Sequence, residues 1–210
     1  TYDITELLEK GRSNALGLIL LHGWYDRAVG YPEIWSPWGE KNALLGMLEI
    51  IYEDGGRDVI ATDGSFACCA DGPVREDDIY QGEFYDANRE QPGFDRAGFS
   101  EAGWYPAQEN AVEEAYLSLP LVGKKNEPIR CVEILTPVEV SQPVENVFVY
   151  DFGQNFAGIC RIRVKGIKGQ ILTLRYGEAL NTEDLLNRDD EAGTIWTENL
   201  GTAEATEYYV

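Results

Sequence analysis

Residues 150–158, YDFGQNFAG, decide the fold prediction because they lead from a strand into a polar corner. Just before the corner, Val147 and Val149 are apolar, β-branched residues that favour strands. Gly153 and Gly158 bracket two side-chain amides, which can tie irregular backbone together by hydrogen bonds. A strand that ends in a glycine-bounded polar corner is typical of antiparallel β domains.

Alternating segments extend this pattern along the chain. Residues 159–164 and 171–176 interleave apolar and polar side chains, and a glycine turn at 166–169 joins them. Residues 14–21 are too apolar to alternate and predict a strand buried on both faces. Residues 43–53 fit a helix or a strand, and the strand is favoured because DGGR at 54–57 is a hairpin turn. Further strands are predicted at 59–62, 66–69, 131–135, 138–140, 147–151 and 204–210.

The composition supports many short strands. The chain has 210 residues, 44% of them apolar, with 22 Gly and 9 Pro against a single Met. That is enough for one large core or two small ones, and no apolar run approaches the length of a membrane span. The net charge of −20 disfavours nucleic acid and anionic membrane surfaces as partners, while neutral sugars and Ca²⁺ stay compatible with it.

Cysteine and histidine usage limits the possible chemistry. The four cysteines, Cys68, Cys69, Cys131 and Cys160, show no CxxC spacing, so they predict free thiols rather than a zinc site. Free thiols favour a reducing compartment, and we expect a cytoplasmic location, with secretion of a full-length protein as the alternative. His22 is the sole histidine and is interpreted as structural.

The composition of residues 120–128 is that of a linker, so we expect two domains, 1–120 and 129–210. The fold class predicted for both is all-β, as β-sandwich modules with few short helices. Residues 110–119 contain enough Ala and Glu for one helical turn.

Motifs spread over the whole chain resemble the non-catalytic N-terminal part of bacterial α-L-rhamnosidases. In the first domain they are YDIT at 2–5, NALG at 14–17, GWY at 23–25, GP at 72–73 and IY at 79–80, with GE at 82–83, YDA at 85–87 and Trp104. In the second they are YDFGQN at 150–155, Glu178, TENL at 197–200 and TEY at 206–208. Each motif alone is weak, but together they occur in the family's order.

The resemblance implies jelly-roll or galactose-binding-like sandwiches ahead of a catalytic (α/α)₆ barrel. In the family this barrel, a glycoside hydrolase, removes terminal α-L-rhamnose by an inverting route. A barrel and these modules do not fit together into 210 residues, so we expect the chain by itself to be inactive. The resemblance also implies strands before Thr1, the catalytic barrel of the same full-length protein as a partner, and possible homodimerisation. The alternative to a carbohydrate-binding role is a scaffold that orients the barrel and the dimer.

An aromatic loop is the candidate carbohydrate site. Aromatic faces bind the apolar side of a pyranose, while carboxylates and amides bind its hydroxyls. The alternative is that these aromatics only fix the loop to the sandwich. The candidate residues are Trp35, Trp38, Tyr31, Glu33 and Asn42, with Asp26 and Glu40 nearby.

An acidic stretch forms a second candidate. Its members are Asp78, Glu83, Tyr85 and Asp86, preceded by Asp77. Oxygen ligands of this kind suit Ca²⁺, but the spacing is not that of an EF-hand loop. We favour a structural role, in which these side chains fix a corner by hydrogen bonds. Asp151 and Glu178 could be proposed as an acid–base pair, but a turn-capping role for Asp151 is preferred.

Overall fold

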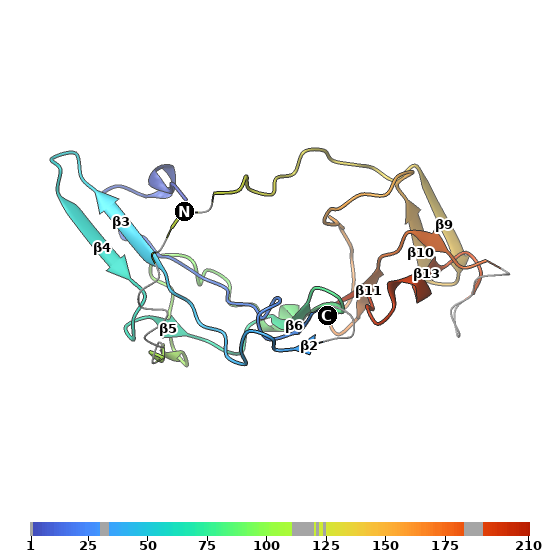
Figure 1. Ribbon diagram of the computed structural model, residues 1–210, viewed down its shortest axis with the longest axis horizontal. Coiled ribbons are helices and arrows are strands. Elements are labelled where there is room, and N and C mark those ends of the chain that lie inside the picture. Colours follow the sequence, from blue (N-terminus) through green and yellow to red (C-terminus); the bar gives the residue numbers. More distant parts are fainter. Residues whose placement is uncertain (1, 30–33, 111–119, 121, 124, 183–190) are drawn as a thin grey trace. The chain divides into compact units, whose positions relative to one another are not determined.

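The computed structural model describes residues 2–29, 34–110, 120, 122–123, 125–182 and 191–210, and within them the chain is all-β (Figure 1). The described helices are three single turns of 3₁₀ geometry, η1 (Thr5–Leu7), η2 (Ala87–Arg89) and η3 (Glu198–Leu200). The predicted all-β class is therefore confirmed. The helical turn predicted at 110–119 lies almost wholly outside the described residues.

The chain divides into two compact units, and the second of them includes residues from both sides of the boundary predicted from composition. The first unit holds residues 1–73 and 89–126, and the second holds 74–88 and 127–210. Residues 74–88 thus belong to the same unit as the C-terminal part of the chain, whereas the predicted division into 1–120 and 129–210 places them in the first domain. That division stays a prediction about domains, whereas the units describe where contacts concentrate.

The first unit consists of three antiparallel ribbons. They are β1 (Ala28–Val29) with β2 (Ile34–Trp35), β3 (Met47–Ile51) with β4 (Arg57–Ala61), and β5 (Ala67–Cys68) with β8 (Tyr105–Pro106). The β3–β4 hairpin confirms the strand interpretation of residues 43–53 (Figure 1). Asp54 shapes its turn by accepting a hydrogen bond from Gly56 N at 2.8 Å, and Gly55 adopts φ 85°.

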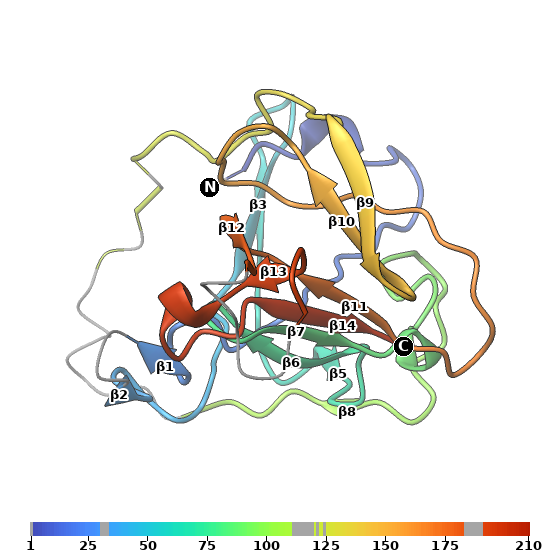
Figure 2. The ribbon, with the colours of Figure 1, turned by 90° about the vertical axis from the view of Figure 1, so that its right-hand side faces the viewer.

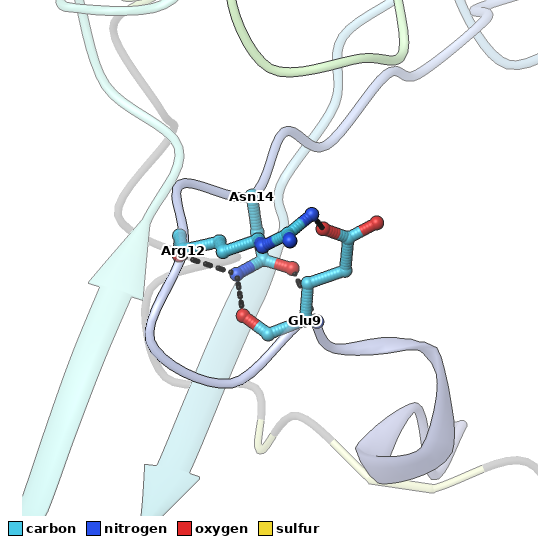
Figure 3. Close-up of polar contacts among 3 residues, drawn as sticks. All are labelled: Glu9, Arg12 and Asn14. Atoms are coloured by element: carbon cyan, nitrogen blue, oxygen red, sulfur yellow. Dashed lines mark hydrogen bonds and ion pairs between the residues drawn. The ribbon is translucent and has the colours of Figure 1, made fainter.

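A side-chain amide closes the turn that follows η1 (Figure 3). Asn14 Oδ1 accepts from Glu9 N at 2.8 Å, and Asn14 Nδ2 donates to the carbonyls of Glu9 and Arg12 at 3.1 Å each. The Arg12 guanidinium lies 3.5 Å from the Glu9 carboxylate. Gly11, at φ 73°, supplies the left-handed residue that lets the chain reverse here.

The second unit is built around a four-stranded sheet in the order β11-β14-β7-β6 (Figure 2). Its strands are β6 (Val74–Asp78), β7 (Gly82–Tyr85), β11 (Leu172–Arg175) and β14 (Thr206–Tyr209). β14 pairs antiparallel with β11 but parallel with β7, in the register Tyr208↔Phe84 and Tyr209↔Tyr85. Two further ribbons are β9 (Glu139–Val144) with β10 (Val147–Asp151), and β12 (Ala179–Leu180) with β13 (Ile195–Trp196).

The corner at 150–158 is fixed by polar side chains. Asp151 Oδ1 accepts from Gly153 N at 2.6 Å, which confirms the turn-capping role expected of this carboxylate. Asn155 Nδ2 donates to Glu178 Oε1 at 2.7 Å, so the corner is tied to the residue that precedes β12. Phe152 and Phe156 meet edge to face, with ring centroids 5.3 Å apart.

Three segments with strand-like sequences form no ladder in the described structure. Residues 14–21, 131–135 and 159–164 were expected to be strands, and the structure assigns none of them to one. Their apolar side chains are exposed, for example Val132 at 96% and Ile159 at 98%. An alternating sequence favours a strand only where another strand offers hydrogen-bond partners, and none of the described strands pairs with these segments.

Buried apolar side chains are few among the described residues. Ala28 and Val149 are the apolar side chains that are more than nine-tenths buried, and Asn181 and Thr206 are the polar ones. Asn181 Nδ2 donates to Thr194 Oγ1 and to the Ile195 carbonyl, which holds the ends of the β12–β13 hairpin together. Ladders, capped turns and aromatic pairs are therefore the main contacts that define these elements.

Candidate carbohydrate-contact loop and acidic corner

The aromatic loop, residues 22–42, is organised by the β1–β2 ribbon. Ala28 pairs with Trp35 across the ribbon. Directly after β2, Ser36 turns the chain back with a φ of 47°, and its N–H donates to the Arg27 carbonyl at 3.2 Å. The Ser36 hydroxyl donates to the Asp26 carbonyl at 3.2 Å. These bonds hold the backbone that carries Trp35 against the backbone of residues 26 and 27.

The two tryptophans of the predicted site are open to solvent. Trp35 is 61% exposed and Trp38 is 57% exposed. Asn42 Nδ2 donates to the Leu21 carbonyl at 3.0 Å, so its amide nitrogen is already used within the loop. Tyr31 and Glu33 lie outside the described residues, and for them the site assignment stays a prediction.

A buried carboxylate lies in the same loop. The Asp26 side chain is 11% exposed, and its Oδ2 lies 3.9 Å from His22 Nε2. Within the described part of the chain its other oxygen, Oδ1, is buried without a hydrogen-bond partner. An unpaired buried carboxylate oxygen is costly, so this atom is expected to bind an ordered water.

His22 connects this carboxylate to Arg27. Arg27 NH2 lies 3.4 Å from His22 Nδ1, and since a guanidinium can only donate, Nδ1 must accept. His22 Nε2 lies on the Asp26 side of the ring, 3.9 Å from Asp26 Oδ2. The sequence places Asp26 near the loop, but its burial and the His22–Arg27 contact follow from the ribbon and could not be predicted from residue spacing.

One contact in the loop is plainly structural. The Tyr25 ring lies directly against Gly39, where any Cβ would collide with the phenol oxygen. The loop therefore contains both an aromatic that packs on backbone and two that face solvent. Different aromatics of the loop therefore make different contacts.

The acidic corner belongs to the second unit and contains two capped turns. Asp78 Oδ1 accepts from Tyr80 N at 2.8 Å and from Gln81 N at 3.0 Å, which closes the turn between β6 and β7. Asp86 Oδ1 accepts from Asn88 N at 3.0 Å and from Asn88 Nδ2 at 2.9 Å. Both carboxylates make the contacts that a corner-fixing residue makes.

Glu83 lies between two other carboxylates. On β7 it pairs in register with Asp77 of β6. Partial burial raises the pKa of Glu83, and the charges of Glu207 and Asp77 raise it further. Glu207 in turn accepts a hydrogen bond from the Tyr176 hydroxyl at 2.7 Å. Burial and this bond raise the pKa of Tyr176, so the phenol stays the donor.

The remaining member of the corner, Tyr85, stacks on Tyr209 with ring centroids 5.4 Å apart and planes inclined by 6°. Of the residues that the structure describes, no three acidic, histidine or cysteine side chains come together in an arrangement that could hold a metal ion. The described helices also include none with the length and apolar character of a membrane span. Within the acidic corner, the hydrogen bonds of Asp78 close the turn between β6 and β7.

The comparison with protein families assigns both halves of the chain to one kind of enzyme. Residues 1–133 match the α-L-rhamnosidase N-terminal domain, and residues 141–210 match the bacterial α-L-rhamnosidase concanavalin-like domain. An α-L-rhamnosidase of Streptomyces avermitilis is 37% identical over the whole chain, and one of Alteromonas sp. is 32% identical. The chain spans 19% and 21% of the lengths of these two relatives.

Solved structures agree with this assignment. The S. avermitilis α-L-rhamnosidase in complex with L-rhamnose superposes on 90% of this chain with a TM-score of 0.75 and 34% identity, over 17% of its own length. The Aspergillus terreus α-L-rhamnosidase gives a TM-score of 0.76 and 31% identity over 90% of this chain and 20% of its own. The all-β modules are thus an α-L-rhamnosidase N-terminal domain and a concanavalin-like domain. The chain belongs to the α-L-rhamnosidase family, as the motifs predict.

Proposed function

We propose that this chain is a non-catalytic accessory part of an α-L-rhamnosidase and that its aromatic loop contacts rhamnose-containing carbohydrate. The full-length enzyme would hydrolyse terminal α-L-rhamnose from glycosides with a catalytic barrel that these β modules support. The observation that carries the sugar contact is the pair of solvent-facing tryptophans, Trp35 and Trp38, in the loop that also holds the Asp26 carboxylate.

The chemistry of that loop suits a monosaccharide. A tryptophan face covers the apolar C–H side of a sugar ring, and carboxylates and amides near it can bind the ring hydroxyls. The site is shallow, because both tryptophans remain more than half exposed, and we expect weak binding with a Kd of roughly 1 mM. Ca²⁺ would act as a bridging ion only if the sugar hydroxyls complete its ligands.

A titration of L-rhamnose followed by tryptophan fluorescence tests the sugar contact. We expect a saturable change that is lost in Trp35→Ala and Trp38→Ala and kept in Trp196→Phe, which removes a half-buried tryptophan of β13 in the other unit. The titration is run with and without Ca²⁺, and L-fucose serves as a stereochemical control. A flat response to L-rhamnose in both buffers would remove the binding claim.

The second candidate is a purely structural scaffold, favoured by the packing inside the loop. Asn42 is bound to the Leu21 carbonyl and Tyr25 packs on Gly39, so part of the predicted site serves the loop itself. A scaffold would leave the fluorescence titration flat and would lower the stability of the full-length enzyme when the loop is altered. Aryl α-L-rhamnoside hydrolysis by the chain alone is expected to be undetectable under either function.

A further inference from the structure

The β6–β7 hairpin is separated along the chain from the rest of the unit in which it lies. The chain enters the second unit after Pro73, returns to the first after Asn88, and enters the second again after Asn126. The hairpin is therefore an insertion with two covalent ends, and its partner strand, β14, is more than 100 residues away in sequence.

The contacts between hairpin and β14 are dense and specific. Gln81 Nε2 donates to the Thr202 carbonyl at 3.1 Å, and Gln81 Oε1 accepts from Glu204 N at 3.3 Å, so one amide binds both sides of the incoming backbone. The rings of Phe84 and Tyr85 pair with those of Tyr208 and Tyr209. Four backbone bonds of 2.9–3.1 Å complete the seam: Ala205 N to Tyr80 O, Thr206 N to Gln81 O, Val210 N to Tyr85 O and Ala87 N to Val210 O.

The hairpin is also held together within itself. Asp78 caps its turn and Asp86 caps its exit, as described above. At its base, the carboxylate of Asp71 forms an ion pair with Arg89, which holds the incoming and outgoing chains side by side. A segment with fixed ends and an internally fixed turn can leave and rejoin a sheet as one piece.

From these observations we propose that the β6–β7 hairpin is exchangeable between two copies of this chain, so that the hairpin of each copy completes the sheet of the other. The contacts with β14 described above join residues 80–87 to residues 202–210, and each of them can form between two chains as well as within one. Exchange of an identical element is a low-cost route to a dimer. This inference does not depend on carbohydrate binding.

The balance between the two forms depends on protein concentration. Within one chain the hairpin and β14 are tethered at an effective concentration of roughly 1 mM, so monomers should dominate at equilibrium in dilute solution. When the chain is refolded at a concentration near that value, a neighbour's hairpin competes with the tethered one. The exchanged dimer is then expected to persist after dilution, because its release requires a sheet to open.

Two single-cysteine chains test the exchange. In a background with Cys68, Cys69, Cys131 and Cys160 changed to Ser, one chain carries Tyr85→Cys and the other Tyr209→Cys. These positions are in register on neighbouring strands, whose spacing of about 4.8 Å suits a disulfide. After joint refolding at high concentration and mild oxidation, exchange predicts a covalent dimer of the two different chains.

Controls make the result unambiguous. The double variant in one chain should give an intramolecular disulfide at low concentration, which shows that the geometry permits the bond. The Tyr85→Cys chain refolded alone should give no covalent dimer. If the double variant cross-links within the chain while the mixed chains never do, the proposal is overturned.

The unmodified chain provides a measurement that does not depend on cysteine substitutions. Light scattering after refolding should show a dimer fraction that rises several-fold between about 10 µM and about 1 mM protein, as the effective-concentration argument requires. A monomer at every concentration would contradict the proposal. If the unmodified chain forms a dimer but the Tyr85→Cys and Tyr209→Cys chains never cross-link with each other, the dimer contact lies elsewhere and the proposal is contradicted as well.

Discussion

Asn14 shows how one side chain can define a turn. Its amide oxygen and nitrogen together make three hydrogen bonds to the backbone of residues 9 and 12 (Figure 3). The spacing of residues along the chain does not indicate which side chain closes the turn. Asp3 makes a similar local contact, since its Oδ1 accepts from both Thr5 N and Thr5 Oγ1. Leu7, within η1, is 78% exposed.

The change Asn14→Ala should open this turn locally. It removes the acceptor of Glu9 N and the donors to two carbonyls, a loss of about 1 kcal/mol for an exposed site. Amide hydrogen exchange at Glu9 should therefore become roughly fivefold faster. Ser13→Ala, a neighbouring exposed position, is the control, and equal exchange rates in the two variants would contradict the assignment.

Glu83 gives the second unit a defined pH response. Its raised pKa means that the folded state binds a proton more tightly than the unfolded chain does. Its contribution to stability is therefore most favourable at low pH and is lost as the pH rises from the ordinary value of 4.5 through the raised one. Glu83→Gln should be more stable than the parent at pH 7, and the difference should shrink below pH 4.5.

Urea unfolding at a series of pH values measures this difference. Because the side chain is only partly buried, salt should weaken the effect. Glu6→Gln, at an exposed carboxylate of the first unit, is the matched control and should show no such pH dependence. Parallel pH profiles for the parent and the Glu83→Gln variant would show that neither burial nor the charges of Glu207 and Asp77 raise the pKa of this carboxylate.

At the level of elements, the β7–β14 pairing depends on Gly82. Gly82 adopts φ 109°, and a Cβ there would collide with the Thr206 carbonyl. Gly82→Ala should therefore separate β14 from β7 and destabilise the second unit by about 3 kcal/mol or more. Thermal unfolding followed by circular dichroism measures the loss. Gly72→Ala, where nothing lies within 4 Å of the added Cβ, should be close to neutral.

The sequence predicts local elements better than it predicts which distant strands pair with each other. The β3–β4 hairpin and the corner at 150–158 are recognisable because a DGGR turn and an Asp-x-Gly cap act within a few residues. The parallel pairing of β7 with β14 is not recognisable, since nothing in either strand indicates a partner so far away. The same limit explains why residues 131–135 and 159–164 have strand sequences without a described ladder.

For the candidate site, too, the sequence indicates local features better than contacts between distant segments. The sequence identifies Trp35 and Trp38 as candidates but leaves open whether they face solvent or fix the loop to the sandwich, and the structure shows both exposed. The burial of Asp26 and the use of the Asn42 amide depend on how β1 and β2 bring distant backbone together. The spacing of these residues along the chain predicts neither the burial of Asp26 nor the hydrogen bond of the Asn42 amide.

For the whole molecule, the family assignment and the compact units divide the chain differently. The N-terminal family match ends at residue 133, yet the β6–β7 hairpin within it belongs to the sheet that contains β14. The two matched regions should therefore depend on each other for stability. An excision of residues 129–210 as a separate domain would leave β14 without its parallel neighbour.

A chain cut between the two regions tests this dependence. A protease recognition sequence inserted after Glu133, in a segment where Val132 is 96% exposed, allows cleavage of the folded protein. The two pieces should still co-elute in size-exclusion chromatography, because the seam with β14 holds them. The same cut in the Gly82→Ala chain should release two separate pieces, and release from the parent chain would show that the seam is too weak to join them.

The distance between Gln81 and Thr202 has a consequence for biosynthesis. These residues are 121 positions apart, and a ribosome adding 5–20 residues per second needs about 6–24 s to cover that interval. During this time the hairpin has left the ribosome with an edge that β14 has not yet covered. Newly made chains should therefore rely on chaperones most during this interval, and codon changes that slow translation between the two segments should lower the soluble yield.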